Sequence, residues 1–472
     1  QKYMETKEQY KDCILFYRLG DFYEMFFDDA IVASKELEIA LTGKSCGLEE
    51  RAPMCGIPYH AVETYLARLV SRGYKVAICE QVEDPKLAKG LVKREVIPVV
   101  TPGTNLDVQS LEASKNNYLM CIAYTSDGIG ISAADVTTGD YYVTEVEDLR
   151  KLKDELMKYE PSEIICNEAF LVSGYDVEDL KSRLHMSVSS LESHMFDDDG
   201  CRRILMRHFK VNTLIGLGVE EFPTGILAAG ALLQYLYDTQ KTDLEHFTHI
   251  SPYLTSKYML LDSSTRRNLE LTETLREKQK RGSLLWVLDK TKTAMGGRLL
   301  RNYIEQPLID KEEMEKRLDA IQELNQDSIS RDEIREYLNP VYDLERLLSK
   351  VTYKTANPRD LIAFRNSLQM LPPIKTVLAG FQKEELAAIR EEIDGLEDIY
   401  QLIDEAIVEE PPISIREGGM IKDQFDETID HLRAAKHDGK QWLVQLEEED
   451  RERTGIKNLK IKKNNVFGYF FE

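Results

Sequence analysis

The chain has 472 residues, with 61 Lys and Arg against 83 Asp and Glu and a formal net charge of −22. This length corresponds to about three domains of ordinary size. No apolar run approaches the roughly 20 residues of a membrane span, and seven scattered cysteines without zinc-like spacing favour a reducing compartment over a disulfide framework. We therefore expect a cytoplasmic protein without a metal site or a membrane partner.

The acidic total, taken alone, argues against nucleic-acid binding. The charge is unevenly distributed, however. Residues 1–106 carry 14 basic and 16 acidic side chains, so most of the negative charge lies further along the chain. The beginning of the chain is thus the part in which a nucleic-acid surface is most plausible on charge.

A β hairpin is predicted near the start of the chain. The β-prone run 14–18 precedes Gly20-Asp21, a two-residue turn signal that joins hairpin strands. Because successive side chains of a strand point to opposite faces, Phe22, Glu24 and Phe26 should share one side, with Phe22 and Glu24 about 7 Å apart. An aromatic ring and a carboxylate would then face the same way.

A helix is the alternative for this stretch. Asp21 would be its N-cap and Glu24 the partner in a capping box, so that Phe22 and Glu24 would diverge around the helix. We favour the hairpin because Asp28-Asp29 is a better cap for the segment 30–37, where we expect the helix to begin.

The rest of residues 1–115 reads as a small mixed α/β domain. A loop rich in Gly, Cys and Glu leads to a helix at 61–72, and a strand at 74–79 follows. Gly43-Lys44-Ser45 imitates the end of a phosphate-binding loop, but Glu38 stands where that motif requires Gly, so we expect no nucleotide site. Four basic side chains could contact phosphates or form a plain solvated face: Lys86, Lys89, Lys93 and Arg94.

Residues 116–250 alternate strands and helices, which favours a largely parallel sheet. Strands are expected at 118–124, 128–136, 141–146 and 163–166, with a helix ending near Tyr159. Asp135 and Asp140 lie at strand ends, where a nuclease would hold metal, but the sequence offers no convincing third carboxylate. We interpret His246 and His249 as ordinary surface histidines because no further ligand completes a set.

From residue 222 onward helical periodicity dominates. Prolines punctuate predicted helices at 224–240, 311–326, 359–369, 383–393 and 424–450. Near the end of the last helix, Glu447 should pair with Arg451 and Glu449 with Arg453. A lysine-rich stretch then precedes the β-prone run 466–471, for which we find no partner strand.

Several motifs together carry a resemblance to a known family. Gly20-Asp21-Phe22-Tyr23-Glu24 resembles the Phe-x-Glu signature of the MutS family of bacterial DNA mismatch-recognition proteins. The similarity spans essentially the whole chain. Further matches, in family order, are 54–63, 77–81, 100–104, 265–270, 357–361 and 451–455.

The resemblance implies a multidomain fold that combines α/β and all-α parts. It places a mixed α/β mismatch-recognition domain at 1–115 and a ribonuclease H-like connector domain at 116–250. A helical core with long lever helices would occupy 251–455, and 456–472 would begin a β clamp domain.

The resemblance also assigns roles to residues. Phe22 would be the wedge that stacks into the duplex at a mispair, and Glu24 the acid that hydrogen-bonds the displaced base. Lys462 and Lys463 would touch the DNA backbone without reading its sequence. Without the resemblance, Phe22 would be read as a core aromatic and Glu24 as a solvated strand residue.

The implied partners are double-stranded DNA with mismatches or small loops, a second copy of the protein in a homodimer, and a downstream protein of the MutL type. No phosphate-binding loop occurs in the 472 residues. We therefore expect no enzyme activity, no catalytic residue and no cofactor in this chain. ATP and Mg²⁺ are expected only for an ATPase domain further along. The alternative is a structural or protein-interaction fragment with negligible DNA binding in isolation.

Overall fold

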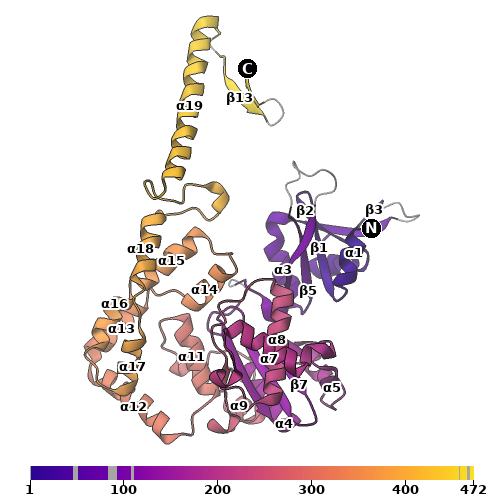
Figure 1. The fold of residues 1–472 in the computed structure, drawn as a ribbon, viewed down its shortest axis with the longest axis vertical. Helices are drawn as coiled ribbons and strands as arrows, with labels where there is room; N and C mark the ends of the chain where they lie inside the picture. The colour runs from indigo at the N-terminus through magenta and orange to yellow at the C-terminus, as the bar shows by residue number, and fades with distance from the viewer. Residues whose placement is uncertain (1, 46–50, 83–92, 108–110, 457, 465–467) are drawn as a thin grey trace. The chain divides into compact units, whose positions relative to one another are not determined.

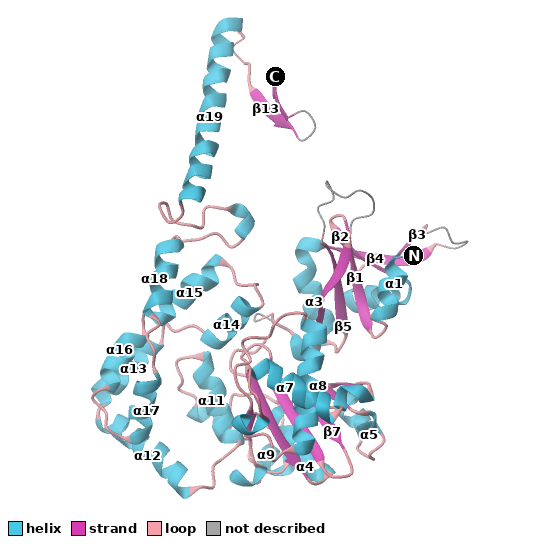
Figure 2. Cartoon of the chain, in the orientation of Figure 1, coloured by secondary structure: helices cyan, strands magenta, loops and turns pink. Residues whose placement is uncertain are grey.

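The structure is a computed structural model that describes residues 2–45, 51–82, 93–107, 111–456, 458–464 and 468–472. The chain divides into two compact units (Figure 1). Gln1–Ala356 with Met370–Asp394 form the first unit, and Asn357–Gln369 with Gly395–Glu472 form the second. Strands are confined mainly to the early part of the first unit, and helices make up most of the rest (Figure 2).

The first part of unit 1 is built on a six-stranded sheet of order β3-β4-β2-β1-β5-β6. Its elements are α1 (Lys2–Gln9), β1 (Cys13–Leu19), β2 (Phe22–Phe26), α2 (Phe27–Leu37), β3 (Thr42–Lys44), β4 (Ala52–Pro58), α3 (Val62–Ser71), β5 (Lys75–Gln81) and β6 (Arg94–Val100). One apolar cluster joins the sheet to α2 and α3, and another includes Tyr3 of α1. The sheet is mixed: β1 is parallel to β5 and antiparallel to β2.

The predicted hairpin is confirmed. β1 and β2 pair with Leu19 opposite Phe22, and Gly20 at the turn has a φ of 60°, which glycine adopts without a steric penalty. The sequence missed β4, which pairs antiparallel with β2 where a loop was expected. The hairpin therefore lies inside the sheet, with a neighbour on both sides.

The prediction that Asp28-Asp29 caps the next helix is wrong. α2 begins at Phe27, and both acids lie in its first turn. Asp29 is buried and accepts hydrogen bonds from the Tyr3 hydroxyl at 2.9 Å and the Leu15 amide at 3.1 Å, and it pairs with Lys7 at 2.9 Å. Tertiary contacts with α1 and β1 thus use the carboxylate that the local pattern assigned to capping.

The second sheet of unit 1 has the order β11-β10-β7-β8-β9-β12. Its elements and the main helices around it are β7 (Leu119–Tyr124), β8 (Ile129–Asp135), β9 (Asp140–Val146), α4 (Leu149–Tyr159), β10 (Glu163–Cys166), β11 (Ser187–Ser190), α7 (Asp198–Phe209), α8 (Pro223–Gln240) and β12 (Ser251–Pro252). The sheet is mixed: β10 is parallel to β7 and β11, and β12 is parallel to β9, as the expected largely parallel sheet requires, whereas β7, β8 and β9 form an antiparallel meander that the sequence did not predict. The turns between these strands are too short for the crossover that a parallel pair requires.

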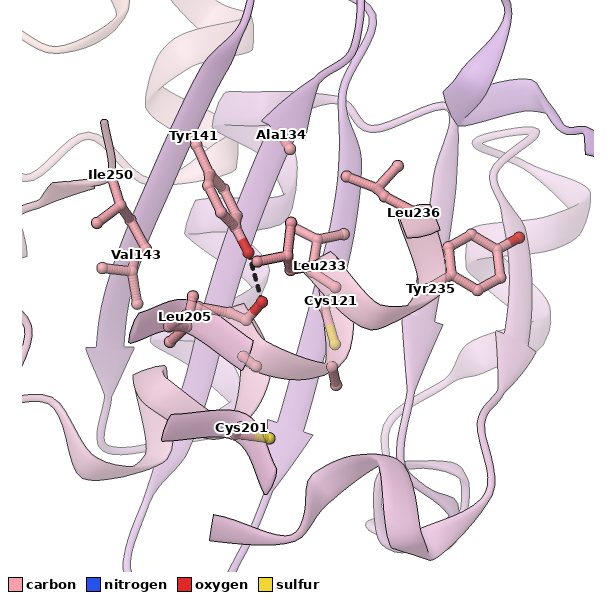
Figure 3. Close-up of a cluster of buried hydrophobic side chains, with 14 of the residues drawn as sticks. Cys121, Ala134, Tyr141, Val143, Cys201, Leu205, Leu233, Tyr235, Leu236 and Ile250 are labelled. Carbon is pink, nitrogen blue, oxygen red and sulfur yellow. Dashed lines mark hydrogen bonds between the residues drawn. The ribbon is translucent and has the colours of Figure 1, made fainter. Parts of the chain in front are cut away.

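Helix α8 packs against one face of this sheet (Figure 3). Leu233 and Leu236 pack with Cys121 and Val143 of the strands, and the Tyr141 hydroxyl donates to the Ala229 carbonyl. The helix approaches β8 so closely that a Cβ on Gly130 would lie 1.9 Å from the Thr224 carbonyl oxygen. A second cluster, which includes α4, fills the other face.

Asp135 and Asp140 face each other across the β8–β9 pair and are bridged by the Asn116 amide, at 2.9 Å from each carboxylate. Burial and the Asp135 charge raise the pKa of Asp140. Asp135 also accepts from the amide of Thr137 at 2.8 Å. These carboxylates are satisfied by protein donors, as expected for structural groups.

The interpretation of His246 as a surface residue is wrong. Its side chain is buried, with Nε2 2.9 Å from the Val136 carbonyl oxygen, and burial lowers its pKa to about 4. His249 is exposed, as expected. The two histidines lie on a loop after α8, so sequence spacing alone could not distinguish their environments.

The part of unit 1 that follows β12 consists mainly of helices. They are α9 (Ser263–Asn268), α10 (Leu284–Leu288), α11 (Ala294–Glu305), α12 (Lys311–Gln326), α13 (Ser328–Leu338), α14 (Leu344–Thr352), α16 (Leu371–Leu378) and α17 (Glu384–Glu392). The predicted helices at 311–326 and 383–393 are confirmed, to within one residue at each end. The buried Arg298 joins α11 to the start of α14, because its guanidinium donates to the Asp343 carboxylate at 2.6 and 2.8 Å.

Unit 2 contains α15 (Pro358–Leu368), α18 (Glu397–Ala406), the 28-residue α19 (Glu427–Thr454) and a hairpin of β13 (Ile461–Asn464) and β14 (Gly468–Phe471). The described part of the run at 466–471, which is β14, therefore has a partner in β13, contrary to expectation. Glu447 pairs with Arg451 as predicted, but Arg453 pairs with Asp450 at 2.8 Å rather than with Glu449. Among the described helices, none is both long and apolar enough to cross a membrane.

Candidate nucleic-acid interface

Phe22 is an exposed aromatic residue of the predicted hairpin. It begins β2 beside the Gly20-Asp21 turn, and 48% of its surface is accessible. Its neighbours Tyr23 and Met25 point to the opposite face and are buried. Strand alternation sets only the side of the sheet on which Phe22 lies, because Phe26 on that side is buried. The exposure of Phe22 therefore follows from its place at the hairpin end.

Phe22 and Glu24 lie on the same side of the sheet, as predicted. Gly56 of β4 is opposite Glu24 in the register. A Cβ built on Gly56 would contact both side chains, at 3.7 Å from Glu24 Cγ and 3.9 Å from Phe22 Cδ1. The ring and the carboxylate side chain therefore both lie within van der Waals distance of the same position on β4.

The hairpin end is held by a contact from its own strand β1 and by contacts from two other elements. Arg18 donates to the Gly20 carbonyl at 2.5 Å, and its guanidinium lies 3.8 Å from the centre of the Tyr59 ring. The Tyr59 amide in turn donates to the Asp21 carbonyl at 3.0 Å. On the buried face, the Tyr23 hydroxyl donates to Glu80, and burial together with Glu80 raises the Tyr23 pKa. Phe22 thus projects from a rigid turn.

Glu24 has a basic partner that the sequence did not reveal. Lys44 of β3 reaches across β4 and places Nζ 2.6 Å from Glu24 Oε2. The Glu24 side chain is 17% exposed and that of Lys44 is 43% exposed. In the sequence, Lys44 stands out only in the Gly43-Lys44-Ser45 run that imitates the end of a phosphate-binding loop. Strand alternation could not predict the pair, because its partners lie on strands separated by a third.

Of the four basic residues that could contact phosphates according to the sequence, two lie in the described part of the structure. Lys93 pairs with Glu95 at 2.6 Å. Arg94 donates to the Arg18 carbonyl at 2.8 Å, so it supports the hairpin. Lys86 and Lys89 lie outside the described residues.

The other two predicted site residues belong to unit 2. Lys462 lies on β13, and its ammonium pairs with the Glu472 carboxylate. The backbone of Lys463 pairs with Tyr469, while its side chain lies outside the described part of the structure. Of the four candidates, the structure brings Phe22 and Glu24 together.

The described part of the chain holds no cluster of three or more His, Cys, Asp or Glu side chains that could bind a metal ion. The chemistry available at the hairpin is therefore stacking by an exposed ring and hydrogen bonding by a carboxylate beside an ammonium group. This combination suits a flat base whose edge carries hydrogen-bonding groups.

Comparisons with known proteins identify the family to which the chain belongs. Residues 1–109 match the family MutS domain I, residues 117–250 match MutS domain II, and residues 264–465 match MutS domain III. The chain is 64% identical over its whole length to the DNA mismatch repair protein MutS of Lachnoclostridium phytofermentans, of which it covers 51%. It is 53% and 52% identical to the proteins of the same name from Ruminiclostridium cellulolyticum and Acetivibrio thermocellus, each covered to 54%. The chain thus spans about half the length of these curated relatives, and on these matches it belongs to the MutS family, with regions corresponding to domains I, II and III.

Proposed function

We propose that this chain recognises mismatched DNA and that Phe22 is the group that probes the duplex. The observation that carries the proposal is the half-exposed ring of Phe22 on a rigid hairpin end, with the Glu24 carboxylate on the same side. The relatives that the chain resembles are named as DNA mismatch repair proteins.

A wedge can find mismatches without reading sequence. Inserting a side chain between bases costs a few kcal/mol of unstacking energy, and this cost is smallest where a pair is already disrupted. A ring that is held outside the core before binding needs no rearrangement of the protein to insert. Mismatch preference then arises from the lower deformation energy of the mispaired step.

Glu24 is the group that we propose to contact the displaced base. A carboxylate near phosphates is repelled, so it is useful there only if it accepts a hydrogen bond from a base N–H or is itself protonated. Its position on the Phe22 side of the sheet supports this role, because one inserted ring would bring a base edge near the acid.

The finer organisation of the chain follows from the same proposal. We infer a mismatch-recognition domain at 1–115, a ribonuclease H-like connector at 116–250, a helical core and lever domain at 251–455 and the start of a clamp at 456–472. The mixed sheet covered by α8 and the hairpin after α19 support the second and fourth of these assignments. Lys462 and Lys463 would contact the DNA backbone.

The remaining functions of the whole protein are also proposals. We propose that ATP hydrolysis, dimerisation and the engagement of a MutL-type partner depend largely on the half of the relatives that this chain does not span. The chain itself should then hydrolyse no ATP, and its DNA binding should be weak, because a single copy would hold the duplex without the second copy of the proposed homodimer.

Fluorescence anisotropy with a labelled duplex tests the proposal. The chain is titrated into a duplex with one central mismatch and into the matched perfect duplex, each at 50 and 150 mM salt. We expect affinity to fall with salt, as for phosphate contacts, and the mismatched duplex to bind more tightly at both salt concentrations. Equal affinity for the two duplexes would contradict mismatch recognition. Absence of binding at 50 mM salt would favour the alternative of a protein-interaction fragment.

A further inference from the structure

The pair between Glu24 and Lys44 links the candidate base-reading acid to a cation on the edge strand β3. Lys44 Nζ lies 2.6 Å from the Glu24 carboxylate and 5.6 Å from the centre of the Phe26 ring. Phe26 is buried, so the ammonium group lies beside an apolar ring as well as beside the acid. The lysine is the more exposed partner, which leaves its ammonium accessible from solvent.

This placement addresses an electrostatic difficulty at the site. A free carboxylate beside the phosphate backbone would oppose DNA binding, whereas a carboxylate paired with an ammonium group carries no net charge toward the duplex. The ammonium group can exchange a carboxylate oxygen for a phosphate oxygen, because both are anionic acceptors of its N–H groups. Its stem is flexible, and its partner lies on a different strand.

We propose that Lys44 is a specificity-determining residue that neutralises Glu24 in the free protein and transfers to a backbone phosphate when a duplex enters. The carboxylate is then left to accept from the displaced base. This inference rests on the proposed function, since it gives Glu24 and the duplex the roles described above. It adds Lys44 to the proposed site and gives an order of events: the Lys44 ammonium group leaves Glu24 when the Glu24 carboxylate hydrogen-bonds the base.

A double-mutant cycle tests the coupling between the two side chains. The chain, its Lys44→Met variant, its Glu24→Gln variant and the double variant are titrated into mismatched and perfect duplexes at 50 mM salt. Lys44→Met keeps an unbranched side chain of similar length but removes the charge. Lys151→Met is the control, because Lys151 also pairs with a glutamate, at 2.7 Å, and its loss changes the net charge by the same amount.

With Glu24 present, we expect Lys44→Met to weaken perfect-duplex binding about threefold, because the lost phosphate contact is partly offset by a Glu24 pair that no longer has to be broken on binding. With Gln at position 24, the same change should cost about tenfold, because the phosphate contact is lost and there is no pair to break. Lys44→Arg should retain most of the affinity. Lys151→Met should shift binding less than twofold, roughly the effect of a screened distant charge.

An equal fold-change in both backgrounds would overturn the inference, because Lys44 would then act independently of Glu24. So would wild-type affinity of Lys44→Met for both duplexes. Circular dichroism of each variant verifies folding, and Lys44→Arg supplies the same comparison if Lys44→Met does not fold. Failure of the proposed function has a separate signature: Phe22→Ala would leave the mismatch preference unchanged, whatever Lys44 does.

Discussion

Replacing Phe22 by Ala should abolish the preference for mismatched DNA while leaving phosphate-driven binding intact. The magnitude follows from the exposed surface of the ring. A large aromatic side chain offers roughly 200 Å² of surface, and 48% of Phe22 is accessible in the free protein. Insertion into the base stack would therefore remove about 100 Å² from water, worth about 2.5 kcal/mol at about 25 cal/mol per Å².

This free energy corresponds to a roughly 60-fold loss of affinity for the mismatched duplex. It lies within the range of about 1–3 kcal/mol per base found when stacking aromatics are replaced by Ala. The perfect duplex should lose much less, because there the gain from stacking is offset by the full cost of unstacking a sound base step. The salt dependence should be unchanged, since Phe22 contacts no phosphate.

Anisotropy titrations of the chain and its Phe22→Ala variant, each with mismatched and perfect duplexes at two salt concentrations, measure these quantities. Ile97→Ala is the matched control, because Ile97 is 47% exposed in the same domain but lies on β6, two strands away from the hairpin. The reasoning is refuted if Phe22→Ala keeps the mismatch preference, or if Ile97→Ala reduces it as strongly.

Further predictions concern the acid, the buried carboxylate of β10 and a buried histidine. Glu24→Ala should hold or raise affinity for the perfect duplex, and Glu24→Gln should keep more mismatch affinity than Glu24→Ala if the acid must donate; both are read from the same titrations. Glu163→Ala should lower the free energy of unfolding by about 3–5 kcal/mol in urea titrations. The Glu163 carboxylate accepts from the Gly103 amide at 3.0 Å and from the Tyr235 hydroxyl at 2.6 Å, and the substitution leaves these buried donors without their acceptor. A loss below 1 kcal/mol would contradict this. His246 has a folded pKa of about 4 against an ordinary 6.5, so the unfolded state binds the proton first and stability falls as pH drops from 6.5 toward 4. Relative to His246→Gln, the chain should lose up to about 3 kcal/mol over that range in pH-dependent denaturation, and parallel pH profiles would show the histidine to be uninvolved.

The sequence by itself determined much of the local structure. The β-prone run, the Gly20-Asp21 turn and period-two alternation correctly predicted the hairpin and the common side of Phe22 and Glu24. Several helix bounds, including 311–326, were also predicted, because caps and prolines act over a few neighbouring residues. The motifs that resemble the MutS family were readable for the same reason: each is contiguous in the chain.

Only the tertiary structure decided which distant residues meet. It placed β4 beside β2 and buried His246. It also placed the Asp29 carboxylate in a buried hydrogen bond with Tyr3 instead of at a helix cap. It also brought Lys44 to Glu24 across an intervening strand. These outcomes depend on strand order and on packing between separate elements, for which short-range periodicity holds no information. The physical reason is that a strand pattern specifies which face a side chain occupies, whereas the charge it meets there is set by the register of the neighbouring strands.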